Sequence, residues 1–233
     1  MEKTKILILP HAGGNPLMYN RLQKAFSLYF NCEIIQYPNR PVFFKGKPNT
    51  TIQEYSGALE NTISKLDEEH IILFGHSMGG LIAYDYLKTA SFFNNKKIVL
   101  AIISSFDFEN QPVNLINLKK EERFRLLRKL LEKTEMIPLA MTEDKKFLDF
   151  AIPPLENDLL AINHYRNDGR AIDVPLIVSY GTDDVFIDEK GIESWRNYTF
   201  NKVKFLKFSG NHFYFIDKEM EVSKRIFKLF KEM

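Results

Sequence analysis

The stretch ILFGHSMGGLIAYDYL, residues 72–87, places a serine between two glycines where strand-forming residues give way to helix-forming residues. We predict a strand over Ile71–Phe74, a tight turn of the form G-x-S-x-G, and a helix from about Met78. Small residues beside the serine let a strand turn directly into a helix without clashes. Ser77 would then point outward above the free N–H groups of the helix N-terminus, which favour negative charge. The pattern indicates a nucleophile that passes through an oxyanion; the alternative is a tight turn with an incidental serine.

Short, continuous apolar runs recur along the chain, and helical patterns separate them. Most of the runs lack period-two alternation, as expected of strands covered on both faces of a parallel sheet. One helical pattern, opened by Thr50 or Thr51, extends over residues 52–66, and another extends over residues 222–230. Strands that alternate with helices indicate an α/β fold with a mainly parallel sheet. The predicted strands are residues 6–9, 34–35, 71–74, 98–103, 176–180 and 203–208.

One segment, from about Gln111 to Arg170, breaks this alternation because it holds no strand candidate. It contains two strongly helical stretches, residues 118–136 and 143–166. Roughly sixty residues of helix exceed a plain crossover, and α/β folds bind their ligands at the carboxyl edge of the sheet. We therefore expect a single domain, residues 1–233, with a helical lid inserted at about 111–170.

The composition is that of an ordinary soluble protein, with 45% hydrophobic and 27% charged residues among 233. A net charge of +2 argues against a general nucleic-acid binder. Cys32 is the only cysteine, so no internal disulfide is possible. No segment approaches the roughly 18 apolar residues of a membrane span, and the N-terminal apolar run is too short for a signal peptide. We expect a cytoplasmic protein that binds neither membranes nor nucleic acid.

A serine nucleophile needs a histidine base, and His212 is the candidate. It lies in the loop after the last predicted strand, and in nucleophile-elbow folds the chain order is Ser, then Asp or Glu, then His. The alternative is a loop histidine packed among the aromatic residues 213–215. The other histidines flank turns, begin a strand or lie in the predicted lid: His11, His76, His70 and His164.

The base in turn needs an orienting acid that follows a strand. Asp183 and Asp184 come directly after the strand at residues 176–180, in a Gly-Thr-Asp-Asp sequence that is also typical of a simple turn. Asp107 is a rival, because it follows the preceding strand and some elbow hydrolases place the acid there. The residues alone leave these three carboxylates open.

An oxyanion hole is expected from two backbone N–H groups, one of Met78 and one from the loop after the first strand. That loop, Pro10-His11-Ala12-Gly13-Gly14, lets the backbone approach a ligand closely. We predict Ala12 as the second donor, the alternative being a plain strand-to-helix turn.

Taken together, the motifs resemble the stand-alone type II thioesterases of nonribosomal peptide and polyketide pathways, which are α/β-hydrolases. The similarity extends over nearly the whole chain, including the lid. The motifs are LPHAGGNPLMY, IIQYPNRP, LFGHSMGGLIAYDYL, IVSYGTDD and FSGNHFYF.

The resemblance implies an enzyme that hydrolyses acyl groups from the phosphopantetheine arm of acyl- or peptidyl-carrier proteins, clearing stalled or misprimed modules. It implies Ser77 as nucleophile and His212 as base. It selects Asp184 as the acid, through the family's G-x-x-D turn from Gly181, and places the oxyanion donors at Ala12 and Met78. We expect a monomer without metal or cofactor, because a thiol of pKa about 8.5 is a good leaving group and no metal-ligand spacing is present.

Two positions depart from the family pattern, and both replace a glycine with asparagine: Pro38-Asn39-Arg40 stands for P-G-R and Gly210-Asn211-His212 for G-G-H. Asparagine is the non-glycine residue that best tolerates a positive φ. We therefore expect both loops to keep their shape.

The helix predicted at Leu118–Met136 allows two interpretations. Its apolar stripe, Phe124, Leu127, Leu130 and Leu131, would cover the acyl channel. Its remaining residues include seven basic and four acidic side chains, so it could attract an acidic carrier protein. The other interpretation is a solvated amphipathic helix with i,i+4 ion pairs.

Two other functions share parts of this pattern. A small carboxylesterase or lipase would use the same triad on oxygen esters, although the H-G-G-G oxyanion motif of that class is missing. A hydrolase-fold protein that binds a ligand without catalysis would not need all three triad positions filled.

Overall fold

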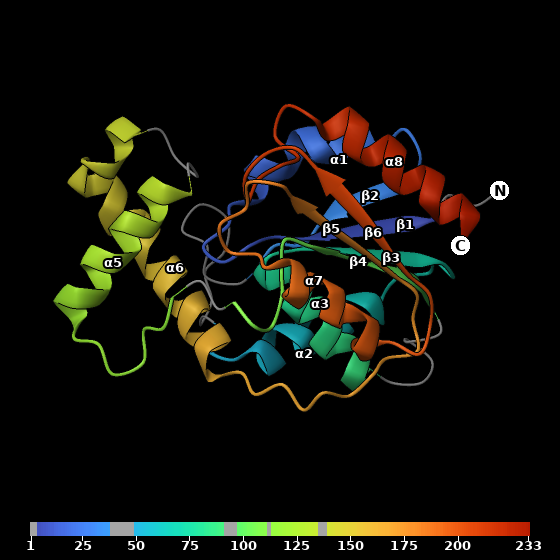
Figure 1. Ribbon diagram of the computed structural model, residues 1–233, viewed down its shortest axis with the longest axis horizontal. Coiled ribbons are helices and arrows are strands. Elements are labelled where there is room, and N and C mark those ends of the chain that lie inside the picture. Colours follow the sequence, from blue (N-terminus) through green and yellow to red (C-terminus); the bar gives the residue numbers. More distant parts are fainter. Residues whose placement is uncertain (1–3, 38–48, 91–96, 111–112, 135–138) are drawn as a thin grey trace.

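The computed structural model describes residues 4–37, 49–90, 97–110, 113–134 and 139–233. Its centre is a six-stranded sheet, with all pairings parallel and the order β2-β1-β3-β4-β5-β6 (Figure 1). The strands are β1 (Lys5–Leu9), β2 (Asn31–Ile34), β3 (Ile71–His76), β4 (Ile98–Ser104), β5 (Leu176–Gly181) and β6 (Val203–Phe208). The predicted parallel α/β fold is therefore confirmed.

The prediction was least accurate for β2, which occupies Asn31–Ile34 rather than residues 34–35. It is an edge strand with no fully buried residue. Because an edge strand is only partly covered, its sequence lacks the continuous apolar run that marks the central strands.

Helices cover both faces of the sheet (Figure 1). On one face Ile6 and Ile8 pack in a core with α1 (Asn20–Phe26) and α8 (Glu219–Glu232). On the other face Leu7 and Leu9 pack in a core with α2 (Ile52–Ile63) and α3 (Met78–Thr89). Successive strand residues point to opposite faces, and each fully buried aliphatic side chain contributes about 1.5–3 kcal/mol. This double burial explains why the runs in β1 and β3 are continuously apolar.

Local signals set the starts of the helices. Of the two threonines proposed to open α2, Thr51 is the N-cap, and it forms a capping box with Glu54. The shorter elements are α7 (Glu189–Ser194) and three turns of 3₁₀-helix: η1 (Pro16–Tyr19), η2 (Leu139–Thr142) and η3 (Trp195–Tyr198). No helix in the described ranges is both long and apolar enough to cross a membrane.

Two long helices, α5 (Lys120–Lys133) and α6 (Lys145–His164), lie between β4 and β5 in sequence and to one side of the sheet (Figure 1). The described part of residues 111–170 contains no strand, as predicted. The predicted first helix is too long at its start, since α5 begins at Lys120, and Met136 lies outside the described residues. Phe124 is also misplaced in the predicted stripe: burial along α5 begins at Leu127, and Phe124 is 36% exposed.

Candidate active site

The tight turn after β3 holds Ser77 in a backbone conformation that non-glycine residues rarely adopt, with φ of 54°. Ser77 is the N-cap of α3, and its N–H donates to the Ser104 carbonyl at 2.7 Å. Its own carbonyl accepts from the Gly80 N–H at 2.8 Å. The strained turn is therefore anchored to the neighbouring strand β4 and to the first turn of α3.

The flanking glycines are required by close backbone contacts. A Cβ at Gly75 would overlap the backbone of Gly79 and Gly80, and a Cβ at Gly79 would overlap the carbonyl of Leu9. The G-x-S-x-G spacing thus reflects how tightly α3 passes over the ends of β1 and β3.

His212 and Asp184 form a buried pair beside this turn. The His212 Nδ1 lies 2.9 Å from Asp184 Oδ2, and Asp184 Oδ1 accepts from the Phe186 N–H at 3.0 Å. A carboxylate only accepts hydrogen bonds, so the pair favours the tautomer with the proton on Nδ1 and leaves Nε2 as an acceptor. His212 and Ser77 line the same small cavity, of about 50 Å³.

The two rival carboxylates have other partners. Asp183 accepts from the Gly210 N–H at 3.1 Å and is exposed. Asp107 is buried, and it accepts from the N–H groups of Glu109, Asn110 and Asp188 at 2.9, 2.7 and 3.1 Å. In the described part of the chain neither is hydrogen-bonded to His212. Only Asp184, of the three candidates, is placed to orient that imidazole.

The loop after β1 brings Ala12 to the wall of the cavity. Gly14 donates to the His11 carbonyl at 2.9 Å, which fixes the His11–Ala12 peptide plane. Since C=O and N–H point in opposite directions across a trans peptide, the Ala12 N–H is directed away from this bond. Ala12 lines the cavity, and Met78 follows Ser77 at the first position of α3. Neither N–H has an acceptor among the residues that the structure describes.

The walls of the cavity come from the strand ends and from the helices between β4 and β5. Leu130 and Thr134 belong to the α5 region, and Leu155 and Leu159 to α6. Phe186 and Phe213 add apolar surface, and the cavity is also lined by the polar residues Ser105, Asp107 and Asn110. The arrangement brings the Ser77 hydroxyl, the His212 ring and the backbone of Ala12 to one small cavity.

His76 belongs to a buried polar network that sequence reasoning missed. Its Nδ1 lies 2.9 Å from Ser104 Oγ, which contacts the Tyr214 hydroxyl at 2.8 Å. That hydroxyl also contacts Ser179 Oγ at 2.7 Å. Burial lowers the pKa of His76 well below its usual value, and the nearby His212 and His11 add to this; burial also raises the pKa of Tyr214 to about 12. The network is therefore uncharged at neutral pH, and it includes the residue directly before Ser77.

The remaining histidines differ in setting. His11 is buried, and its Nδ1 lies 2.5 Å from the Tyr19 hydroxyl. His164 is exposed on α6, and His70 precedes β3 at the opposite edge of the sheet. Neither of these two lines the cavity around Ser77.

Of the two asparagines that replace a family glycine, the structure describes Asn211. Residues Pro38, Asn39 and Arg40 lie outside the described residues. At the other position the positive φ belongs to Gly210, at 122°, and not to Asn211. The Asn211 side chain instead accepts from the Phe213 N–H at 2.9 Å, so asparagine serves here as a turn residue.

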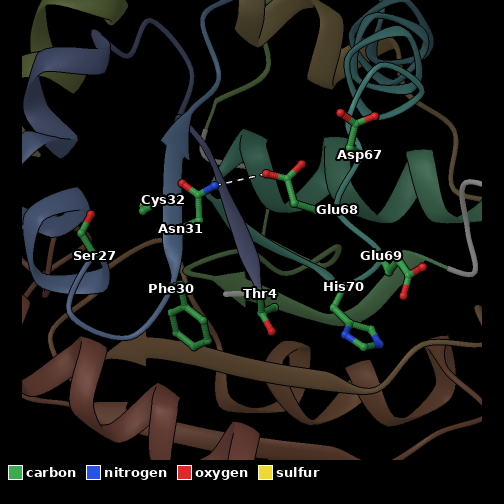
Figure 2. Close-up of a pocket in the computed structure, with 9 residues that line it drawn as sticks. All are labelled: Thr4, Ser27, Phe30, Asn31, Cys32, Asp67, Glu68, Glu69 and His70. Atoms are coloured by element: carbon green, nitrogen blue, oxygen red, sulfur yellow. Dashed lines mark hydrogen bonds between the residues drawn. The ribbon is translucent and has the colours of Figure 1, made fainter. Parts of the chain in front are cut away.

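A larger cavity, of about 600 Å³, lies at the amino edge of the sheet (Figure 2). It includes Cys32, whose thiol pKa is raised to about 12 by burial, and a hydrogen bond from Asn31 to Glu68 at 3.1 Å. A thiol of that pKa is no nucleophile at neutral pH. Within the described ranges no cluster of three or more histidine, cysteine or acidic residues could hold a metal. The carboxyl edge is the better candidate for chemistry.

Residues 4–230 match the family model described as "Thioesterase domain". The chain belongs to the thioesterase family. The family predicted from the motifs is thus confirmed.

Individual relatives of this thioesterase are distant. The gramicidin S biosynthesis protein GrsT of Aneurinibacillus migulanus is 23% identical over 224 residues, which cover 94% of this chain and 86% of that protein. A probable cadicidin biosynthesis thioesterase of Streptomyces griseus is 25% identical, over 91% of this chain and 58% of its own length. The structure of the type II thioesterase BorB, from the borrelidin biosynthetic cluster, superposes with a TM-score of 0.80 at 23% identity, over 98% of this chain and 93% of that chain. The fold is that of the α/β-hydrolase thioesterases.

Proposed function

We propose that this thioesterase removes acyl groups from the phosphopantetheine arm of acyl- or peptidyl-carrier proteins in a nonribosomal peptide or polyketide pathway. The observation that supports it most is that His212 lines a cavity with Ser77 and is paired with Asp184, in a chain that matches the family over residues 4–230. The choice of pathway is supported by the names of two relatives, a gramicidin S biosynthesis protein and a type II thioesterase from the borrelidin biosynthetic cluster.

In this proposal Ser77, Asp184 and His212 form the catalytic triad. Nε2 of His212 takes the proton of Ser77 Oγ as the oxygen attacks the thioester carbonyl. The N–H groups of Ala12 and Met78 stabilise the oxyanion, and each such donor is worth about 10²–10³ in kcat. His212 then gives the proton to the departing thiol. Water attacks the acyl-serine carbonyl as His212 takes its proton, and His212 passes that proton to Ser77 Oγ as the carboxylic acid leaves. Neither a metal nor a cofactor is needed, because the leaving thiol has a pKa of about 8.5.

The proposal treats the chain as one hydrolase domain with a lid at about residues 111–170. Support comes from Leu130, Leu155 and Leu159, which cover the cavity from α5 and α6. We also propose that the enzyme acts as a monomer.

The test measures hydrolysis of three substrates that share one acyl group: a carrier-protein thioester, a pantetheine thioester and an ethyl ester. The proposal predicts that kcat/KM is highest on the carrier protein and lowest, by at least about tenfold, on the ethyl ester. A carboxylesterase would favour the ethyl ester or show no preference, and a binding protein without catalysis would hydrolyse none of the three.

A further inference from the structure

A carboxylate on α6 reaches the loop that carries the oxyanion donor Ala12. Asp158 is fully buried, and its Oδ2 accepts from the Gly13 N–H at 2.7 Å. Its Oδ1 accepts from the Tyr55 hydroxyl of α2 at 2.6 Å. One side chain therefore joins α6, α2 and the loop after β1, segments that are far apart in sequence.

The contact is made at the point where the loop geometry matters most. Gly13 directly follows Ala12, so the bond to Asp158 fixes the peptide plane next to the one that presents the Ala12 N–H. Gly13 has φ of 69°, and a Cβ there would lie 2.9 Å from Leu155 Cβ, so the loop is also pressed against α6.

The start of the loop, at Pro10, is held by a tyrosine that contacts Tyr55. The Tyr37 hydroxyl donates to the Pro10 carbonyl at 3.0 Å, and the rings of Tyr37 and Tyr55 meet edge to face with centroids 5.0 Å apart. Asp158 thus completes a set of contacts that fixes both ends of the loop.

We propose that Asp158 is a positioning residue for the oxyanion hole, so that docking of α6 is required for full catalytic competence. The inference rests on the proposed function of the Ala12 N–H. Donors must be held in place before the reaction to stabilise developing charge, and a misplacement of about 1 Å can reduce a rate by roughly 10²-fold. Loss of the Asp158 carboxylate should accordingly lower kcat and leave KM almost unchanged.

The test uses three variants of the full chain. Asp158→Ala removes the acceptor. Asp158→Asn keeps it, since the amide oxygen can accept from Gly13 while the amide nitrogen donates to the Tyr55 oxygen. Asn163→Ala is the matched control, because Asn163 is also a buried α6 residue and makes two hydrogen bonds, to Leu115 N–H and the Val113 carbonyl, each at 2.8 Å.

Two rates are measured for each variant: kcat on an acyl-pantetheine thioester, and the rate at which a fluorophosphonate labels Ser77. Labelling of Ser77 by the fluorophosphonate depends on the oxyanion hole but does not involve a thioester substrate. We expect both rates to fall roughly 10- to 100-fold in Asp158→Ala, to stay within about threefold of wild type in Asp158→Asn, and to remain near wild type in Asn163→Ala. Thermal unfolding shows how far each variant is destabilised.

Both rates within about twofold of wild type in Asp158→Ala would overturn the inference, as would equal losses in Asp158→Ala and Asn163→Ala. If Asp158→Ala does not fold, the Tyr55→Phe variant replaces it in the test. This variant removes the hydrogen bond from the Tyr55 hydroxyl to the Asp158 carboxylate and should lower both rates severalfold. Unchanged rates in Tyr55→Phe would overturn the inference. A wild-type chain without thioesterase activity contradicts the proposed function, whereas the labelling rates still decide the role of Asp158.

Discussion

At the scale of single residues, the site depends on one strained serine and on the contacts that hold it. A φ of 54° at Ser77 costs on the order of 1–3 kcal/mol, and the hydrogen bonds to Ser104 and Gly80 maintain it. The strain directs the side chain at the apex of the turn into the cavity that His212 also lines.

The choice of acid is testable with three parallel substitutions. Asp184→Asn should lower kcat by about 10³–10⁴, because only a carboxylate on the imidazole fixes its tautomer and stabilises the imidazolium. Asp183→Asn and Asp107→Asn should remain within about tenfold of wild type, since these carboxylates accept from backbone N–H groups and, for Asp183, from the Thr182 hydroxyl, and neither contacts His212. Steady-state kinetics on one thioester substrate checks all three. If Asp107→Asn were the most damaging, the acid would follow β4 instead of β5.

His76 makes the stability of the fold sensitive to acid. Folded His76 resists protonation, because burial and the two histidines His212 and His11 lower its pKa well below 6.5; the tyrosines beside it are neutral. Unfolded His76 binds a proton as the pH falls below about 6.5, so the free energy of unfolding should decrease from there by up to ~1.4 kcal/mol per pH unit. Above about pH 6.5 the contribution of His76 to the free energy of unfolding does not change with pH.

Chemical denaturation at several pH values between about 7.5 and 5 tests this, with His76→Asn as the comparison. Asparagine keeps a polar atom near Ser104 Oγ but does not titrate, so its variant should show a shallower decline in stability below pH 6.5. Parallel curves for the two proteins would mean that His76 does not contribute to the acid sensitivity.

At the scale of elements, α5 combines a buried face with a charged one. Leu127, Leu130 and Leu131 are buried. Arg128 pairs with Glu132 at 3.0 Å within the helix, as the solvated-helix interpretation predicts. Arg125 and Lys129 are exposed and have no ion-pair partner in the part of the chain that is described. Both interpretations of the helix thus keep some support.

A double charge reversal, Arg125→Glu with Lys129→Glu, separates them. If α5 attracts an acidic carrier protein, kcat/KM on the carrier-bound thioester should fall about tenfold at low salt and less at high salt. Activity on a small acyl-pantetheine thioester should not change, because neither residue lines the cavity. Equal effects on both substrates, or none on either, would leave only the solvated-helix interpretation.

At the scale of the whole molecule, the parallel sheet explains why a candidate site could be proposed from the sequence. Every strand ends at the same edge, so residues that follow strands gather there: Ser77 and His212 line one cavity, and Asp184 contacts His212. The buried central strands were recognisable from their apolar runs. The half-exposed β2 was misplaced because its sequence carries no such run.

Contacts between distant segments were not predictable in the same way. Asp158 and Gly13 are 145 positions apart, and Ser104 and Tyr214 are 110 apart. No local pattern links such residues, because their pairing depends on how α6 docks and on strand order. The helix α6 itself was recognised, although it runs through Pro153 and Pro154, where local propensity alone would place a break.

The central claim is that Ser77 is the nucleophile of a carrier-directed thioesterase. The most direct measurement is release of the acyl group from an acyl-carrier protein, followed by intact-protein mass spectrometry, with wild type and with Ser77→Ala. Alanine fits the same backbone turn, so thermal unfolding should be nearly unchanged. The account predicts deacylation by wild type and a loss of about 10³-fold or more in the variant. A Ser77→Ala protein that retained most of its turnover would contradict it.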